Sequence, residues 1–188
     1  MKKYTCNLIT VLGPTATGKT RFAAMLADRM NGEIISADSR QVYKKMDIGT
    51  GKDYKDYRVG NRSVPVHLID IVEPGYEYNV FEYQADFVRV FKEISSSGNL
   101  PFLCGGSGLY LEAVLKGYRL INVPLNESLR KDLEKKTMEE LGEILKSFKK
   151  IHNISDIVSR KRLLRAIEIE IYHHENPEAA PHRGQRGQ

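Results

Sequence analysis

The chain has 188 residues, of which 41% are hydrophobic and 28% are charged, and its formal net charge is +5. This length and composition are typical of a globular protein with one sizeable core, and no stretch reaches the ~18 apolar residues of a membrane span. The apolar run near the N-terminus leads directly into a glycine loop, so we interpret it as a strand and not as a cleaved leader. Cys6 and Cys104 stand in apolar runs and are expected to be buried thiols. We therefore expect a cytoplasmic protein without membrane segments.

The first predicted elements are a buried strand over 8–12, a glycine loop and a helix over 20–30. The loop fits the pattern G-x-x-x-x-G-K-[ST] at every fixed position, and its residues are Gly13, Pro14, Thr15, Ala16, Thr17, Gly18, Lys19 and Thr20. Backbone N–H groups of such a loop converge on phosphates, and the helix N-terminus favours their negative charge. Lys19 is expected to neutralise phosphate charge, and the Thr20 hydroxyl to ligate Mg²⁺. The pattern predicts a site for a di- or triphosphate.

A second predicted strand, 33–37, is followed directly by Asp38. Ligands of parallel sheets bind beyond the carboxyl ends of the strands, so the Asp38 carboxylate is expected to project over the phosphate site. There it would act as a metal ligand or as a general base. The glycine turn that follows, 46–52, carries the Thr50 hydroxyl and the Lys52 ammonium.

Further strands are predicted over 66–71 and 101–104, and further helices over 80–95 and 108–115. This alternation predicts an α/β fold over 1–117, a P-loop NTPase-like parallel sheet flanked by helices. Gly105, Gly106 and Ser107 follow the last strand and place small residues at another strand end. Beyond them, charged amphipathic sequence predicts a small helical insertion over 118–158, a helix returning to the core over 159–175, and a disordered tail over 176–188.

Five segments, in this order, are GPTATGKT, ISADSRQVYKKMDIGTGK, HLIDIVEP, GGSGLYLEAVL and RLLRAIEI. Together they resemble the tRNA dimethylallyltransferase family, also called tRNA isopentenyltransferases. The resemblance implies that the dimethylallyl group of dimethylallyl diphosphate moves to N6 of adenosine 37, beside the tRNA anticodon. The loop would then hold the leaving diphosphate with Mg²⁺, and the partner would be the anticodon stem-loop. We expect a monomer.

The resemblance also implies roles for particular residues. Asp38 matches the general base and acts with Lys19 and Thr20 in catalysis. Ser39, Arg40 and Gln41 match positions near the target base, which must leave the anticodon-loop stack to react. Ser107 matches a hydroxyl that bonds the nucleic acid. The remaining implied tRNA contacts lie in the last third of the chain, at Arg130, Lys161, Arg162, Leu163, Leu164 and Arg165.

Some features depart from the family pattern. Ser159 and Arg160 stand where an Asp-Pro pair is usual, and the family's chain normally continues well beyond residue 188. A short or C-terminally truncated member is therefore expected. Three alternatives remain open: an adenylate isopentenyltransferase acting on AMP, ADP or ATP, a small-molecule kinase that uses ATP, and a catalytically impaired homologue.

Overall fold

A computed structural model describes residues 6–14, 16–148 and 159–177, and the chain divides after Tyr118 into two compact units. Among the helices of the described residues, none combines the length and the apolar character that crossing a membrane would require. Each unit has its own hydrophobic core, and each is described by itself below.

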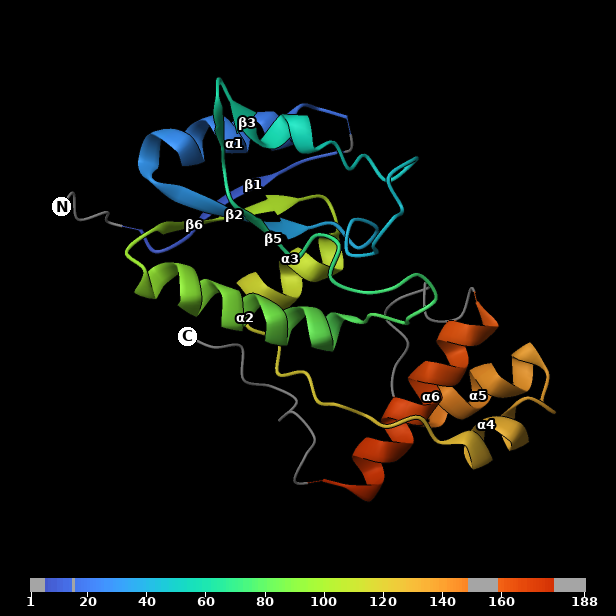
Figure 1. Cartoon of the computed structure of the whole chain (residues 1–188). Coiled ribbons are helices and arrows are strands. Elements are labelled where there is room, and N and C mark those ends of the chain that lie inside the picture. The colour runs from blue at the N-terminus through green and yellow to red at the C-terminus, as the bar shows by residue number, and fades with distance from the viewer. Residues whose placement is uncertain (1–5, 15, 149–158, 178–188) are drawn as a thin grey trace. The chain divides into compact units, whose positions relative to one another are not determined.

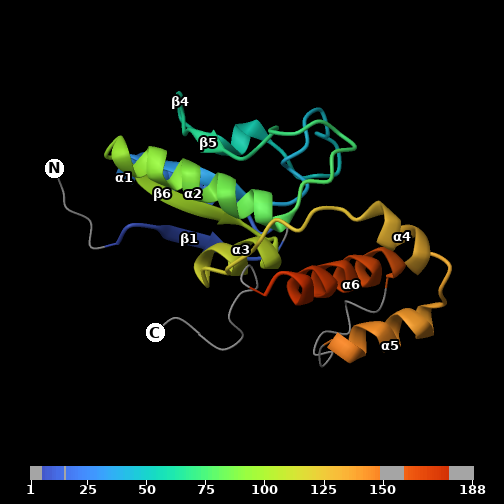
Figure 2. The same cartoon turned by 90° about the horizontal axis from the view of Figure 1, so that it is seen from below.

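The first unit is built on a four-stranded parallel sheet with the order β1, β6, β2, β5 (Figure 1). The strands are β1 (Ile9–Leu12), β6 (Leu100–Gly105), β2 (Gly32–Ala37) and β5 (Val66–His67). Helix α1 (Lys19–Met30) covers one face, and helices α2 (Val80–Ser96) and α3 (Gly108–Leu115) cover the other, as Figures 1 and 2 show. Parallel strands are usually covered on both faces in this way. The predicted P-loop NTPase-like α/β fold is confirmed.

The two faces of the sheet carry different cores. Small residues of α1, such as Ala23 and Ala27, lie fully buried against one face and let the helix approach the strands closely. The other face packs against large side chains of α2, including Tyr83 and Phe87. Helix α2 begins at Asn79, whose side chain and that of Glu82 form a capping box, which satisfies donors at the helix start.

Two sequence expectations in this unit were wrong. The strand expected over 66–71 ends at His67, because Leu68 (φ 61°) and Asp70 (φ 54°) adopt left-handed conformations that a strand cannot continue through. Cys6 is exposed instead of buried, whereas Cys104 is buried as expected. The structure also contains a 3₁₀ turn, η1 (Tyr54–Tyr57), and a short antiparallel hairpin, β3 (Arg58–Val59) with β4 (Arg62–Ser63), which the sequence did not reveal.

The second unit consists of α4 (Glu127–Leu133), α5 (Met138–Phe148) and α6 (Arg160–Glu175) in its described part. Leucines at helical spacing, among them Leu141 and Leu145 of α5, are fully buried against Leu163 and Ile167 of α6. Helix α6 thus packs with the helices predicted for the insertion. Its return to the α/β core stays a prediction, and most of the tail predicted to be disordered lies outside the described residues.

Candidate active site

Three strand ends meet at one edge of the sheet. In the parallel register Leu12 of β1 and Ala37 of β2 both pair with Gly105 of β6. The chain leaves these three positions into the glycine loop, the Asp38 segment and the segment Gly106–Ser107. Segments far apart in the sequence are thereby brought together beyond the carboxyl ends of the strands, where ligands of such sheets bind.

Side chains at the glycine loop form hydrogen bonds with the loop backbone. The Lys19 ammonium donates a hydrogen bond to the Pro14 carbonyl (2.8 Å), and the Thr17 hydroxyl donates to the same oxygen (2.9 Å). Gly18 has φ 76°, a left-handed conformation that glycine adopts without steric cost just before α1. Lys19 and Thr20 are the first residues of α1, as predicted. Thr15 lies outside the described residues.

Gly105 and Gly106 allow the end of β6 to approach both neighbouring segments. A Cβ atom on Gly105 would lie 2.2 Å from the Ala37 carbonyl oxygen, so no side chain fits there. A Cβ atom on Gly106 would lie 3.1 Å from the Gly13 carbonyl oxygen and 3.8 Å from Lys19 Nζ. These glycines therefore let the end of β6 lie close to Ala37 at the end of β2 and to Gly13 at the start of the phosphate loop.

Asp38 lines a cavity of about 460 Å³ together with Lys19 and Thr20. One of its carboxylate oxygens accepts a hydrogen bond from the Arg40 backbone N–H (2.9 Å) and lies 3.7 Å from Arg40 Nε. The side chain is 20% exposed, so the carboxylate remains accessible from the cavity. The structure brings together the three residues to which the sequence assigned the chemistry.

Ser39 and Ser107 are hydrogen-bonded to each other. The Ser39 backbone N–H donates to the Ser107 hydroxyl (2.8 Å), which also lies within hydrogen-bond distance of the Ser39 hydroxyl (3.2 Å). Ser107 also donates its backbone N–H to the Ala37 carbonyl (3.0 Å). Ser107 thus fixes the segment that carries Asp38, and the expected contacts of both serines and Arg40 with RNA stay predictions.

Gln41 is almost fully buried, with 7% of its surface exposed. Its side-chain carbonyl accepts a hydrogen bond from the Ser36 hydroxyl (3.3 Å), and its amide N–H donates to the Gly51 carbonyl (3.2 Å). The side chain therefore braces the turn 49–52 against β2. The amide groups of Gln41 already have partners within the protein. The expected contact of Gln41 with an adenine stays a prediction.

Lys52 is a buried cation, with none of its side chain exposed. Its ammonium donates to the Tyr43 carbonyl (2.8 Å), to Asp70 Oδ1 (2.5 Å) and to Asp47 Oδ1 (3.3 Å). Desolvation favours a higher pKa for Asp70, but the hydrogen bonds from Lys52 and Tyr54 outweigh it and lower that pKa. The sequence drew attention to Lys52 but not to Asp70, which lies in the segment predicted as a strand.

The side chains of the cavity wall that the sequence analysis missed include Asp47, Asp53, Asp56, Tyr57 and Cys104. Of these, Tyr57 and Cys104 are buried. Burial raises the pKa of both, that of Cys104 to about 11, although Lys19 and a hydrogen bond with Thr20 act in the opposite direction on Cys104. Both groups are therefore neutral at pH 7. Tyr57 belongs to the 3₁₀ turn η1, which no local sequence pattern indicated. Cys104 could have been found, since it immediately precedes the strand end at Gly105.

In the second unit, Glu168 binds two of the arginines that were expected to contact tRNA. Its carboxylate accepts from Arg130 (3.0 and 3.1 Å), from Arg165 (2.5 Å) and from the Asn126 backbone N–H (2.6 Å), and the residue is 2% exposed. Desolvation acts to raise the Glu168 pKa, but these bonds outweigh it and lower that pKa. Through Glu168, Arg130 of α4 and Arg165 are held together with α6. The Asn126 N–H holds the segment before α4 to the same carboxylate.

The other residues expected to contact tRNA differ in exposure. Leu163 and Leu164 are buried in the helical core, so their side chains do not reach solvent in this structure. Lys161 and Arg162, at the start of α6, are exposed. Of the four basic residues expected to contact tRNA in this unit, Lys161 and Arg162 are the most exposed.

The sheet, the glycine loop before α1 and the carboxylate at the end of β2 define a P-loop protein. The IPP transferase family model matches residues 41–187, and an isopentenyl transferase model matches residues 6–66. The chain belongs to the IPP transferase family, as the resemblance of its motifs indicated.

Several relatives and solved structures support this assignment. The chain is 60% identical over 173 residues to tRNA dimethylallyltransferase 1 of Parabacteroides distasonis, with 92% of this chain and 56% of the relative covered. It is 53% identical over 182 residues to tRNA dimethylallyltransferase 1 of Syntrophus aciditrophicus, covering 96% of this chain and 56% of that protein. The tRNA isopentenylpyrophosphate transferase of Bacillus halodurans matches with a TM-score of 0.58 and 38% identity, over 87% of this chain and 55% of that one. The chain spans little more than half the length of these relatives.

Proposed function

We propose that this chain transfers the dimethylallyl group of dimethylallyl diphosphate to N6 of adenosine 37 of a tRNA. The observation that carries the proposal is that the Asp38 carboxylate shares one cavity with Lys19 and Thr20. A proton acceptor then stands beside a phosphate site. The names of the relatives, tRNA dimethylallyltransferases, support the choice of both substrates.

In this reaction a bond forms between N6 of the adenine and the allylic carbon, and the bond from that carbon to the diphosphate oxygen breaks. The exocyclic amine is a weak nucleophile and needs a base to accept its proton as the new bond forms. Asp38 takes this proton. The departing diphosphate gains negative charge. The Lys19 ammonium, turned from the Pro14 carbonyl toward the ligand, and the loop N–H groups stabilise this charge.

The Thr20 hydroxyl is an oxygen donor, the kind of ligand that Mg²⁺ prefers, and Asp47, Asp53 and Asp56 also line the cavity. The described residues contain no cluster of three acidic, His or Cys side chains that would hold a metal ion without a ligand, so the diphosphate would have to supply further oxygens. The Thr20 hydroxyl would hold the ion against the diphosphate, where it would supply additional positive charge to the leaving group. We place the reaction in the cytoplasm, with the chain acting as a monomer on the anticodon stem-loop.

A labelling experiment tests the proposal. The chain is incubated with radiolabelled dimethylallyl diphosphate, Mg²⁺ and either an anticodon stem-loop or AMP, and the label in each acceptor is counted. We expect label in the stem-loop alone. Label in AMP alone would identify an adenylate isopentenyltransferase. In a parallel sample that also contains ATP, ATP consumption without allyl transfer would identify a kinase. No transfer to either acceptor would mean that this chain lacks the activity.

A further inference from the structure

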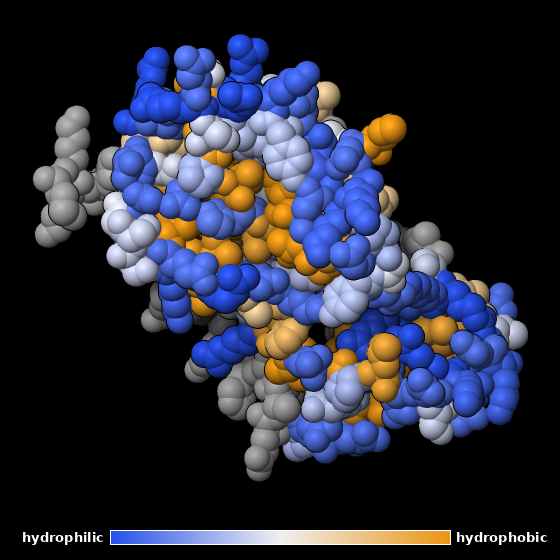
Figure 3. All heavy atoms as spheres, in the orientation of Figure 1, coloured by the Kyte–Doolittle hydropathy of each residue, from blue (hydrophilic) through white to orange (hydrophobic). Residues whose placement is uncertain are grey.

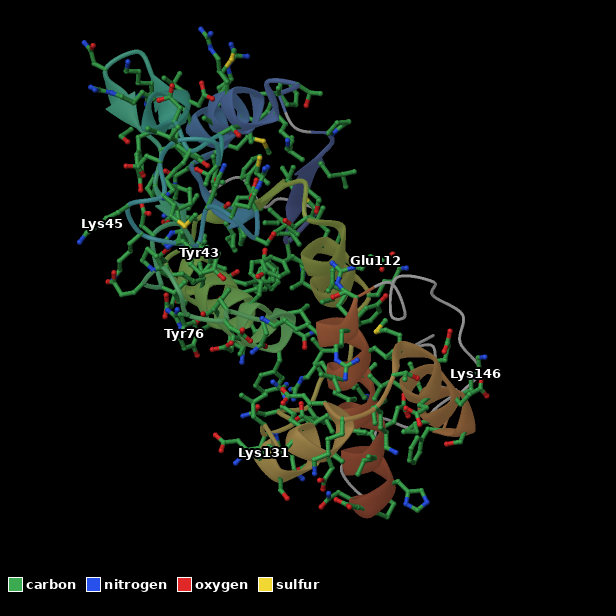
Figure 4. All side chains as sticks on the ribbon, turned by 90° about the vertical axis from the view of Figure 1, so that its right-hand side faces the viewer. Tyr43, Lys45, Tyr76, Glu112, Lys131 and Lys146 are labelled. Carbon is green, nitrogen blue, oxygen red and sulfur yellow. The ribbon has the colours of Figure 1, made fainter. Side chains whose placement is uncertain are left out.

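A second hollow, which we call the outer pocket, lies beside the cavity. It has a volume of about 420 Å³, and its wall includes Arg40, Tyr43, Met46, Ile48 and Tyr76. Figure 4 shows Tyr43 and Tyr76 on the same side of the first unit, with Lys45 projecting outward beyond them. The reaction proposed above makes no use of these side chains.

The outer pocket gathers apolar side chains that are open to solvent. Ile48 is 99% exposed, Tyr76 52% and Met46 43%. Figure 3 shows apolar atoms projecting from the loop between β2 and η1 on this side of the unit. Single exposed apolar residues are common on protein surfaces, but a group of them around one hollow is typical of a binding surface.

The outer pocket is adjacent to the cavity that contains Asp38. Gly49 and Thr50 belong to the walls of both hollows. Arg40, whose side chain is 53% exposed, lines the outer pocket and also lies 3.7 Å from the Asp38 carboxylate. A ligand group in the outer pocket would therefore be next to a group held at Asp38.

The loop that forms the outer pocket is held in place from within. The Thr50 hydroxyl donates to the Met46 carbonyl (2.7 Å), and Lys52 donates to the Tyr43 carbonyl (2.8 Å). On the other side, the Tyr76 hydroxyl donates to Glu82. These bonds fix the backbone while leaving the apolar side chains exposed, so the surface is organised before any ligand binds.

The chemistry of the wall fits a flat, uncharged ring. Unpaired RNA bases stack on tyrosine rings and on arginine guanidinium planes, and apolar side chains complete such sites. No carboxylate lines the outer pocket among the described residues, and the exposed Lys45 beside it suits a phosphate backbone. We propose that the outer pocket binds the unpaired base of a nucleotide that flanks the acceptor adenosine. This inference rests on the proposed function.

Binding measurements test the outer pocket without requiring turnover. The probe is a fluorescent anticodon stem-loop, compared with two copies that lack the base either 5′ or 3′ of the acceptor adenosine. Tyr76→Ala and Ile48→Ala should each raise the Kd for the intact stem-loop, Tyr76→Ala by at least about 5-fold, the lower end for a lost base stack. The matched control is Val88→Ala, which truncates an apolar side chain of α2 that is 43% exposed and should leave the Kd unchanged.

The stem-loops without a base identify the occupant. One of them should bind the unchanged protein about as weakly as the intact stem-loop binds Tyr76→Ala, and Tyr76→Ala should weaken its binding no further. The inference would be overturned if Tyr76→Ala and Ile48→Ala both bound the intact stem-loop with unchanged affinity. It would also be overturned if Tyr76→Ala weakened the binding of all three stem-loops equally. A raised Kd for dimethylallyl diphosphate in the same variants would instead place the allyl group in the outer pocket.

The labelling experiment separates this inference from the proposed function. Binding that depends on Tyr76 without any allyl transfer would contradict the proposed function and leave the outer pocket supported. Allyl transfer to the stem-loop with no effect of Tyr76→Ala would contradict the outer pocket alone. Failure to bind any stem-loop would overturn the outer pocket even if AMP accepted the allyl group.

Discussion

At the scale of single residues, the site depends on the contrast between charged and neutral groups in one cavity. Asp38 and Lys19 carry opposite charges there, whereas burial keeps Tyr57 and Cys104 neutral. Neutral walls lower the local polarity around a ligand and so strengthen the attraction between Lys19 and a phosphate. The other charged side chains of the wall are Lys52 and the aspartates Asp47, Asp53 and Asp56.

Replacing Asp38 tests the proton transfer. Asp38→Asn preserves the size of the side chain and an oxygen that can accept from Arg40, but an amide cannot take a proton from the amine. We expect kcat to fall by at least about 100-fold, while the Kd for dimethylallyl diphosphate changes little. Asp132→Asn, which alters an exposed carboxylate of α4 outside the cavity, is the control. Turnover near the normal rate in Asp38→Asn would remove Asp38 from the mechanism.

The two cysteines offer an internal comparison of thiol reactivity. Cys104 is buried and its pKa is raised to about 11, whereas Cys6 is exposed. Because only the thiolate is alkylated, iodoacetamide at pH 8 should modify Cys6 much faster than Cys104. Peptide mass spectrometry on the native protein measures both rates in one sample. Equal rates would show that Cys104 is neither buried nor neutral.

At the scale of elements, the sequence revealed those structures that local patterns determine. Apolar runs located β1, β2 and β6, and the glycine motif placed the phosphate loop correctly between β1 and α1. The early end of β5 at His67 was missed because Leu68 and Asp70 have no local feature that demands a left-handed conformation. The tertiary bond from Lys52 to Asp70 accompanies that conformation, and no local pattern encodes it.

In the candidate site, too, some features could be predicted from the local sequence and others depend on tertiary contacts. Asp38 follows β2 directly, and Lys19 and Thr20 follow the glycine loop after β1, so their meeting could be predicted from topology. The roles of Gln41 and Arg130 within the fold could not, because their partners lie elsewhere in the chain, Glu168 being 38 residues from Arg130. Family resemblance indicates which residues recur near a substrate but not which of them also hold the protein together.

Helix α6 depends on Glu168 for its attachment to α4. Glu168→Gln would leave Arg130 and Arg165 without their carboxylate, and we expect the free energy of unfolding to fall by roughly 2 to 3 kcal/mol. Thermal and denaturant unfolding followed by circular dichroism would measure the loss. The control is Glu143→Gln, which breaks an exposed pair with Lys146 on α5 and should cost little. Equal stability of the two variants would contradict this role of Glu168.

The same carboxylate makes the stability depend on pH in a defined direction. The folded-state pKa of Glu168 is lowered, so its contribution is fully present above the pKa of an unfolded glutamate, about 4.3, and is lost as the pH falls through the folded value. The difference in stability between the unchanged protein and Glu168→Gln should therefore shrink below about pH 4. A difference that is constant from pH 7 to pH 3 would contradict the lowered pKa.

At the scale of the whole molecule, the two units hold different parts of the proposed function. The phosphate loop and Asp38 belong to the first unit, whereas Lys161 and Arg162 belong to the second. Charges that contact RNA phosphates affect affinity and its salt dependence rather than the chemical step. Substitutions in the second unit should therefore alter the binding of RNA while leaving the binding of dimethylallyl diphosphate unchanged.

Arg162→Ala tests this separation. The side chain is exposed at the start of α6, so its removal should not disturb the helical core. We expect weaker binding of an anticodon stem-loop and a salt dependence flatter by about 0.7 to 0.9 log units per log unit of salt. Lys146→Ala on α5 is the control, and the Kd for dimethylallyl diphosphate should stay constant in both. An unchanged salt dependence in Arg162→Ala would mean that this side chain is only solvated.

The alignment of Leu12, Gly105 and Ala37 across three strands has a consequence for how this chain tolerates changes in length. Removing or adding one residue within β6 would move Gly105 out of line and turn every following side chain to the opposite face of the sheet. After an insertion, Cys104 would come beside Ala37 and carry a Cβ atom where there is no space for one. The exposed turn at 60–61 between β3 and β4 lies outside this parallel register. Insertions and deletions should therefore accumulate in such turns, while the lengths of β1, β2 and β6 stay constant.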